Sequence, residues 1–498
     1  MAAGRLRPDL TKLCKYGIVC EYLTYLSFGW EKPLEQQLHK KYGLMTATAM
    51  VVGTVIGSGV FFKAEAILTK TGGDMGTGIL AWGIGGLIMM ICACTFSIMA
   101  TKYSYVNGVV DYAEVTVGPR YGYLIAWFMT TIYYPAMTSV LAWVSARYLC
   151  VLLGFSITGA ECLCLSCLFL VCSYAVNALS PRIAGKIQVS TTVIKLIPLL
   201  LMAVVGTIAG LRSGVMLENF TTQLTTEQIS EAFAAAGKTY VPSGSILLAS
   251  VVASAFAYEG WIITTCINAE LRDAKKNLPR ALVMGTLVVA CVYILYYIGL
   301  NGGIDKLHLM VSGEAGAQEA FTQVFSSVGG TLLGVFIVIS CLGTLNGLML
   351  GATRGMYALA VRGRGPRPEI FRQVDAATNM PTNSAIAGLV LCALWLTYFF
   401  GANLTGPSWF GPVTFDSSEL PIITIYAMYL PIFVMFMWRE KELSIGRRFI
   451  MPAAAMICSL FMVYAAAMAH GVSAAWYLLV YVCIMAVGIC FMREKKTA

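Results

Sequence analysis

The chain has 498 residues, of which 58% are hydrophobic and 12% charged, and its formal net charge is +9. Ordinary soluble domains carry about 25% charged residues. The composition therefore excludes a soluble globular protein and indicates a polytopic membrane protein. The three histidines, His39, His308 and His470, lie far apart in the sequence, so we expect no metal site and no cofactor.

Membrane-spanning helices need about 20 apolar residues each, and twelve such segments follow a basic tail at residues 1–43. They lie at roughly 44–69, 76–101, 121–149, 160–178, 187–210, 244–268, 281–301, 327–353, 383–402, 417–438, 449–469 and 473–492. Most of the 34 Lys and Arg residues fall in the two tails and in the loops on their side. This asymmetry predicts a multi-pass protein of a cell membrane with both termini cytoplasmic. Because the membrane topology accounts for the positive charge, we expect the protein to lie in the lipid bilayer and to have no nucleic acid partner.

The first segment is interrupted at residues 53–61, Gly-Thr-Val-Ile-Gly-Ser-Gly-Val-Phe. Each interior glycine costs a helix about 1 kcal/mol relative to alanine. Unwinding frees backbone groups that lipid cannot satisfy, and a zwitterionic ligand matches them. The N–H groups of Ser58 and Gly59 begin a half-helix that suits a carboxylate. A close-packing surface is the alternative, since Gly53 and Gly57 are four residues apart.

A second interruption, Phe-Ala-Tyr-Glu-Gly-Trp at residues 256–261, lies in the sixth segment. Broken helices at corresponding places of two halves indicate a transporter binding site. Carbonyls freed at the first two of these residues could accept bonds from an α-ammonium, while Tyr258 and Trp261 cover or gate the pocket. An ionisable residue at such depth is a functional-site hypothesis. Glu259 is either a partner for polar groups of the unwound segment or an acid that faces water.

Lys195 lies well inside the fifth segment, where snorkelling to an interface is difficult. Either it stays charged by donating to carbonyls of the broken first helix, in the place of a sodium ion, or it exchanges a proton during transport.

The eighth segment carries a polar stripe that includes Ser340 and Asn346. These polar side chains either form hydrogen bonds between helices or line the ligand path. Tyr133 and Tyr134, followed by Pro135, predict a pocket wall beside a kink in the third segment.

Six motifs stand in a fixed order along the chain. They are Val51–Phe61, Lys195, Phe256–Trp261, Glu270–Leu271, Lys276–Ala281 and Ser340–Gly347. Together they resemble the amino acid–polyamine–organocation (APC) superfamily, and within it the L-type amino acid transporter light chains and their bacterial relatives. The likeness covers residues ~35–495, nearly the whole chain.

The resemblance implies an all-α LeuT-type fold of twelve transmembrane helices, with helices 1 and 6 unwound at mid-membrane. Its parts are a tail at 1–43, a first inverted repeat at 44–210, an outer loop at 211–243, a second repeat at 244–438, and two further helices with a tail at 439–498. Substrate-binding positions would be Thr54, Val55, Ile56, Gly57, Ser58, Gly59, Phe256, Ala257, Tyr258, Glu259 and Gly260. Lys195 corresponds to the family's lysine in place of sodium, as a coupling residue. Gate or pocket-wall positions would be Tyr134, Trp261, Ser340 and Asn346.

Two departures from the light chains matter. Human light chains pair with a heavy chain through a cysteine after the third helix. Here that loop, about 150–160, is short, and the nearby Cys150 and Cys162 look membrane-embedded. We therefore expect no heavy-chain disulfide. Where many light chains have glycine, this chain has Glu259, as in bacterial forms with an acid there.

The sequence thus predicts a secondary active transporter of small neutral L-amino acids that works by alternating access. It would be sodium-independent, as an exchanger or as a symporter coupled to protons. Cationic amino acids or polyamines are the alternative substrates, and a sensor without transport is a further alternative. A membrane enzyme is not expected, because no nucleophile, base and metal-ligand constellation is present.

Overall fold

The computed structural model describes residues 43–57, 59–103, 108–179, 181–262, 271–375, 380–404 and 408–492. In these ranges the chain forms helices joined by turns and loops. The first half comprises α2 (Leu44–Val55), α3 (Gly59–Lys70), α4 (Met75–Lys102), α5 (Val109–Thr116), α6 (Pro119–Phe128), the π-helix η2 (Met129–Tyr133), α7 (Tyr134–Leu153), α8 (Ala160–Leu179), α9 (Pro181–Leu201), the π-helix η3 (Met202–Gly206) and α10 (Thr207–Ser213).

The second half of the chain continues in the same way. It comprises α11 (Val215–Thr221), α12 (Thr226–Ala235), α13 (Ile246–Ala257), α14 (Ala274–Gly302), α15 (Lys306–Ser312), α16 (Glu314–Ala360), α17 (Pro368–Phe371), α18 (Thr382–Asn403), α19 (Leu420–Arg439), the π-helix η5 (Gly446–Ile450), α20 (Met451–His470) and α21 (Val472–Cys490).

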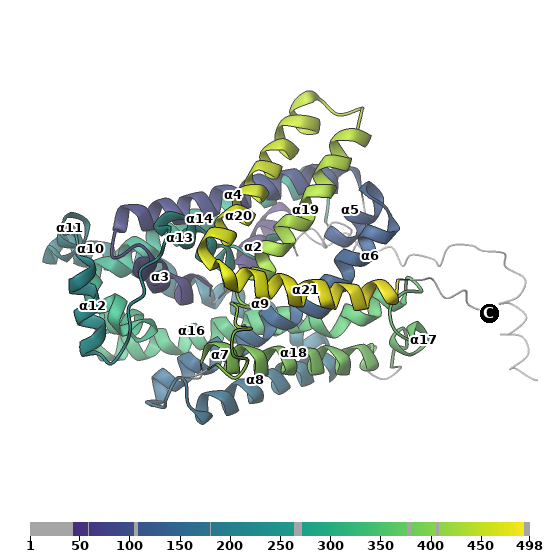
Figure 1. Ribbon diagram of the computed structural model, residues 1–498. Coiled ribbons are helices and arrows are strands. Elements are labelled where there is room, and N and C mark those ends of the chain that lie inside the picture. The colour runs from purple at the N-terminus through teal and green to yellow at the C-terminus, as the bar shows by residue number, and fades with distance from the viewer. Residues whose placement is uncertain are drawn as a thin grey trace, which may run out of the picture. The chain divides into compact units, whose positions relative to one another are not determined.

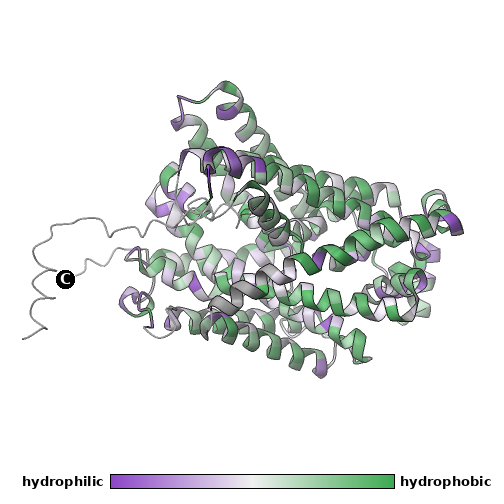
Figure 2. Cartoon of the chain, turned by 180° about the vertical axis from the view of Figure 1, so that it is seen from behind, coloured by the Kyte–Doolittle hydropathy of each residue, from purple (hydrophilic) through white to green (hydrophobic). Residues whose placement is uncertain are grey.

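Ten helical segments of the described chain are long and apolar enough to cross a membrane. They correspond to ten of the twelve predicted spans, and Figure 2 shows their mostly apolar surfaces with polar residues gathered towards the ends. The other two predicted spans, 44–69 and 244–268, contain the interruptions. Their helices α2, α3 and α13 have 12 residues each, about 18 Å at 1.5 Å per residue, which is too short to cross the hydrocarbon core alone. The chain is a multi-pass membrane protein, while the count of twelve spans and the inverted repeat stay predictions.

Two predicted loops contain helices. In the expected outer loop 211–243 the helix α12 begins with a capping box between Thr225 and Gln228. The loop predicted at 302–326 is largely helical, because α15 and the first turns of α16 occupy it. A positive φ of 73° at Ser326 interrupts α16, immediately before the predicted start of the eighth span.

Close helix packing depends on small residues. A Cβ on Gly206 would lie 2.4 Å from the carbonyl oxygen of Gly299, and one on Gly210 would lie 2.5 Å from the Cα of Gly302. Such contacts let helix backbones approach closely, which is the main source of packing energy between membrane helices. Further packing joins α14 to α2 and α4, α16 to α7, α9 and α18, and α13 to α3 and α4.

Successive long helices run in opposite directions, so their connections gather at two faces. The end of α3 lies on the same face as α11 and α12, which we call the Lys70 face. The end of α4 lies with α5 and α17 on the other, the Lys102 face; Figure 1 shows the first at the left and the second at the right. Cys150 and Cys162, in α7 and α8, are both fully buried.

Candidate substrate site

The first helix is interrupted where its glycines predict. The helix α2 ends at Val55, and Ile56 has an extended conformation with φ −68° and ψ 107°. Its N–H still donates to the carbonyl of Val52, at 2.8 Å. A new helix, α3, begins at Gly59. Ser58, and the side chain of Thr54, lie outside what the structure describes.

The sixth predicted span is also interrupted. The helix α13 ends at Ala257, and Tyr258, Glu259 and Gly260 form a turn. Gly260 has a φ of +107°, a conformation that side chains with a Cβ rarely adopt. A single 3₁₀ turn follows at Trp261, and the chain beyond residue 262 lies outside the described residues until 271.

The two interruptions touch each other. A Cβ built on Gly59 would lie 2.4 Å from the Cα of Ala257, so the first residue of α3 meets the last residue of α13. The pairing of the two segments, predicted from their places in the chain, is therefore a contact in the structure. Their side chains are buried: Ile56 is 0% exposed, Phe256 7% and Ala257 1%.

One tyrosine joins the ends of both broken helices. The Tyr293 hydroxyl, on α14, lies 3.1 Å from the carbonyl oxygen of Val55 and 3.0 Å from that of Ala257. A phenol has one hydrogen to donate, so it satisfies only one of the two carbonyls fully at a time. The two carbonyl oxygens can therefore still accept a hydrogen bond from a further donor. Sequence reasoning missed Tyr293, because a tyrosine in an apolar span has the pattern of ordinary packing.

Lys195 reaches the first interruption. Its Nζ donates to the Thr344 hydroxyl at 2.9 Å and to the carbonyl oxygen of Gly53 at 3.4 Å, and the residue is 1% exposed. In a continuous helix the N–H of Gly57 would occupy the Gly53 carbonyl, but α2 has already ended there. The ammonium therefore supplies a donor that the interruption removes. This is the contact that the first alternative for Lys195 requires.

The polar residues of α16 contact two different parts of the chain, the first interruption and α8. Ser340 donates to the carbonyl oxygen of Gly57 at 3.4 Å, and a Cβ on Gly57 would lie 2.7 Å from the Thr344 hydroxyl. Ser340 and Thr344, four residues apart, share the helix face towards the interruption. Asn346 lies on a different face and accepts a hydrogen bond from Asn177 of α8, at 2.9 Å. This is a hydrogen bond between helices, and the role of Asn346 as a pocket wall stays a prediction.

Glu259 is held by the third span. The Tyr133 hydroxyl donates to its Oε1 at 2.5 Å. Tyr133 ends the π-helix η2, a local widening that is frequent at functional sites. The neighbouring Tyr134, the residue predicted as a pocket wall, instead lies against α16, since a Cβ on Gly351 would meet its ring at 2.6 Å. The rings of Tyr133 and Tyr134 lie 5.5 Å apart, edge to face. Sequence periodicity does not reveal which of the two contacts Glu259.

Tyr258 and Trp261 pack as core residues. The Tyr258 hydroxyl donates to the carbonyl oxygen of Trp82 at 2.8 Å, and the rings of Tyr258 and Tyr293 lie 5.2 Å apart. The Trp261 ring lies 5.7 Å from that of Phe96. Both are 1% exposed. That Tyr258 and Trp261 cover or gate the pocket stays a prediction.

The assembled groups suit an α-amino acid. The N-terminus of α3 offers unpaired N–H groups and the positive end of a helix dipole to a carboxylate. The carbonyl oxygens of Val55 and Ala257 both lie next to the Tyr293 hydroxyl, and each keeps a lone pair that can accept a hydrogen bond from an ammonium. In the described part of the chain, no group of His, Cys, Asp and Glu side chains is arranged to hold a metal.

Comparisons with known proteins identify the family of the chain. A family model described as "Amino acid permease" matches residues 42–489. The serine/threonine exchanger SteT of Bacillus subtilis is 27% identical over 416 residues, which cover 83% of this chain and 87% of the exchanger. The human b(0,+)-type amino acid transporter 1 is 24% identical over 398 residues, covering 76% and 77% of the two chains.

A human large neutral amino acids transporter small subunit 2 is 25% identical over 348 residues, covering 69% of this chain and 62% of that subunit. These relatives are transporters and exchangers rather than enzymes. The family model accounts for nearly the whole described chain, including both interrupted helices. The chain belongs to the amino acid permease family of the APC superfamily.

Proposed function

We propose that this permease carries small neutral L-amino acids by alternating access. The observation that carries the proposal is the meeting of two interrupted helices, in which Tyr293 lies within 3.1 Å of carbonyls from both. The α-ammonium would bind these carbonyls and the carboxylate would bind the N–H groups at Ser58 and Gly59. Both substrate groups are common to all amino acids, so the site recognises the backbone of the substrate first.

We further propose that transport is independent of sodium. The Lys195 ammonium lies between Thr344 and the Gly53 carbonyl and brings a fixed positive charge to the first interruption. A monovalent cation beside it would meet like-charge repulsion in a low dielectric. Exchange of one amino acid for another is the favoured mode, as in the serine/threonine exchanger relative, and coupling to protons is the other.

In the proposed orientation both termini are cytoplasmic, so that the Lys70 face is outside and the Lys102 face inside. Alternating access then means that α3 and α13 open the site to the Lys70 face, and that α2 opens it to the Lys102 face. The half-helices α2 and α3 can tilt separately because the extended residue Ile56 separates them.

Uptake into proteoliposomes tests this proposal. Purified protein is reconstituted with or without internal serine, and the uptake of a labelled panel of amino acids is measured with sodium, with potassium, and with an imposed pH gradient. We expect uptake of small neutral amino acids that needs internal substrate and is equal in sodium and potassium. Uptake driven by the pH gradient without internal substrate would indicate symport. Binding without uptake of any amino acid would indicate a sensor and contradict the transporter proposal.

A second substrate class, cationic amino acids, is favoured by one observation. Glu259 places a carboxylate at the second interruption, held by Tyr133 at 2.5 Å, and such a group could pair with the charged side chain of a substrate. The variant Glu259→Gln separates the two classes. If the substrate is cationic, uptake of lysine and arginine falls with this change and that of serine does not. If lysine and arginine are not carried by the wild type, this second proposal fails.

A further inference from the structure

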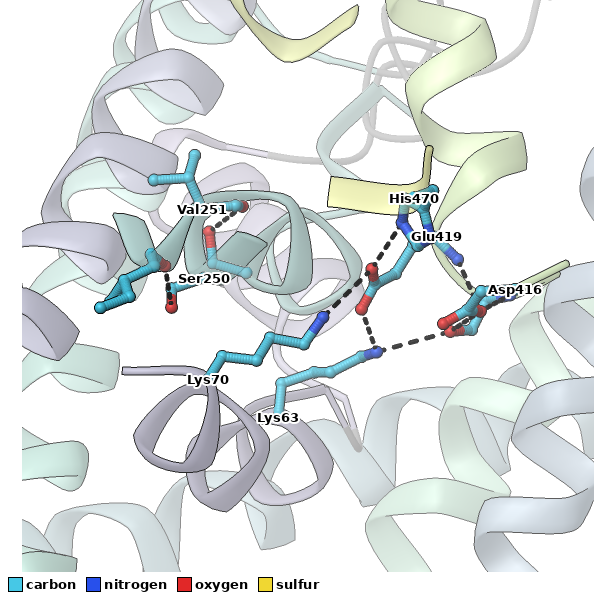
Figure 3. A network of polar contacts seen from close by, with 10 residues as sticks. Lys63, Lys70, Ser250, Val251, Asp416, Glu419 and His470 are labelled. Atoms are coloured by element: carbon cyan, nitrogen blue, oxygen red, sulfur yellow. Dashed lines mark hydrogen bonds and ion pairs between the residues drawn. The ribbon is translucent and has the colours of Figure 1, made fainter. Parts of the chain in front are cut away.

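A buried ion network lies at the Lys70 face, away from the interruptions. Its centre is Glu419, immediately before α19, which is 1% exposed. Lys63 Nζ lies 2.7 Å from its Oε1, while His470 Nε2 lies 3.1 Å and Lys70 Nζ 3.9 Å from its Oε2. Figure 3 shows the two lysines reaching Glu419 from α3, and His470 reaching it from the end of α20. Three elements distant in sequence thus share one carboxylate.

The network is poorly explained by stability alone. Replacing a buried ion pair with apolar residues of similar volume is often neutral or stabilising, whereas removing one partner is strongly destabilising. Lys63 is 4% exposed, so both partners are desolvated. Such a pair makes a two-state contact, since it is favourable when fully formed and unfavourable when half-formed. This property suits a contact that either holds or releases as a unit.

Lys63 connects the network to the candidate substrate site. It lies one turn into α3, the half-helix that begins at the interruption, and its Nζ lies 5.4 Å above the ring of Phe256. Phe256 is the penultimate residue of α13. One lysine therefore touches both interrupted helices and, through Glu419, α19. Motion of α3 away from α13 requires Lys63 to leave Glu419 or Glu419 to move with it.

Hydrogen bonds to neighbouring residues fix the position of Glu419. Asp416 Oδ1 accepts hydrogen bonds from the N–H of Ser418 at 2.6 Å and from the N–H of Glu419 at 3.2 Å, which shapes the turn before α19. His470 contacts Oε2, which leaves Oε1 directed at Lys63. His470 belongs to α20, outside the ten helices of the predicted repeat. One of the two additional helices of the chain, α20, thus contributes to a contact of the central ones.

We propose that Glu419 and Lys63 form the outer gate of this permease, and that His470 is a positioning residue that orients the carboxylate. The proposal rests on the transport function proposed above. When the pair is formed, α3 is held against α19 and the substrate site is covered from the Lys70 face. The pair must separate and re-form in each transport cycle.

Exchange kinetics and equilibrium binding test the gate together. In Glu419→Gln the amide keeps the size of the side chain but loses its charge, so α3 is not held closed. We expect exchange turnover to fall at least tenfold while amino acid affinity, measured by thermal-shift titration, stays within threefold of the wild type. Lys63→Met should give the same result. The exchanged pair Lys63→Glu with Glu419→Lys should recover a substantial part of the turnover. Glu319→Gln, which alters an exposed acid paired with His308, is the matched control and should not change turnover.

The role of His470 is tested by comparing two variants. His470→Ala should lower turnover without changing affinity, whereas His470→Gln, which keeps an N–H donor, should retain most of it. If Glu419→Gln does not fold, Glu419→Asp is measured instead, because it keeps the charge but shortens the reach to Lys63. An intermediate turnover in this variant supports the gate.

Two results would overturn the proposal. One is wild-type turnover in a folded Glu419→Gln or Glu419→Asp protein. The other is an equal loss of affinity and turnover that the exchanged pair does not repair, which would make the network only structural. Failure of the transport proposal is recognised separately, since the wild-type protein would then take up no amino acid.

Discussion

Gly59 and Ala257 touch through their backbones, since a Cβ at residue 59 would lie 2.4 Å from the Cα of Ala257. Backbone atoms cannot swing aside as a flexible side chain does, so the contact exists only because residue 59 is glycine. It brings the start of one half-helix to the end of another, and the candidate substrate site is built around this junction.

The variant Gly59→Ala should therefore lose substrate binding. The added methyl group forces α3 and α13 apart, which separates the carboxylate-binding N–H groups from the carbonyls at Val55 and Ala257. We expect affinity to fall by about tenfold or more, equivalent to about 1.4 kcal/mol, in a thermal-shift titration with amino acids. Gly83→Ala in α4, where a Cβ meets nothing within 4 Å, is the control. Equal affinity in the two variants would remove the junction from the proposed site.

Replacing Lys195 by alanine should affect transport more than folding. The change leaves the Gly53 carbonyl and the Thr344 hydroxyl without a donor that they now have, at a cost of about 1–3 kcal/mol. The larger effect is the loss of the fixed charge at the first interruption, for which we expect turnover to fall about tenfold or more. Lys275→Ala, at an exposed site on α14, controls for the loss of a lysine. Wild-type turnover in a folded Lys195→Ala protein would contradict the coupling role.

Tyr293→Phe removes a single oxygen from the junction. Without the hydroxyl, the carbonyls of Val55 and Ala257 lose their common donor, and the two helix ends are held less closely. We expect substrate affinity to fall by about five- to tenfold, which corresponds to about one hydrogen bond. Tyr296→Phe is the matched control, because its buried hydroxyl makes no hydrogen bond within the described chain. Isothermal titration of both variants measures the difference, and the proposal fails if they bind equally.

Asn219 should not carry a glycan in the folded protein. It matches the Asn-x-Thr acceptor pattern, but the residue is 2% exposed and its amide nitrogen donates to the carbonyls of Asn301 at 2.6 Å and Ile304 at 2.9 Å. An attached sugar would remove both contacts. Expression in eukaryotic cells followed by glycosidase treatment tests this expectation. Asn403 matches the same pattern and serves as the comparison. A mobility shift that disappears in Asn219→Gln, and not in Asn403→Gln, would contradict the observed packing.

Local sequence was sufficient for several features of the fold. Long apolar segments can be stable only in a bilayer, so they indicate the spans wherever these are continuous. Glycines at 53, 57 and 59 weaken a helix through backbone entropy, which is a local effect and favours an interruption there. The burial of Lys195 also follows from its place in an apolar segment, and its choice of partners follows in part from the carbonyls that the interruption leaves open.

Other features depend on contacts between residues far apart in the chain. Apolar periodicity does not show that Tyr293 reaches Val55, or that Glu419 reaches Lys63, because a tyrosine or an acid is compatible with many neighbours. Nor does it show that Tyr133, rather than the adjacent Tyr134, donates to Glu259, or that the Tyr258 hydroxyl donates to the carbonyl of Trp82. The sequence by itself determined which segments are apolar enough to cross a bilayer, where two of them are interrupted, and that Lys195 and Glu259 lie inside such segments. Only the tertiary structure decided which side chains complete the broken ends, because that choice is made by helix packing across the whole chain.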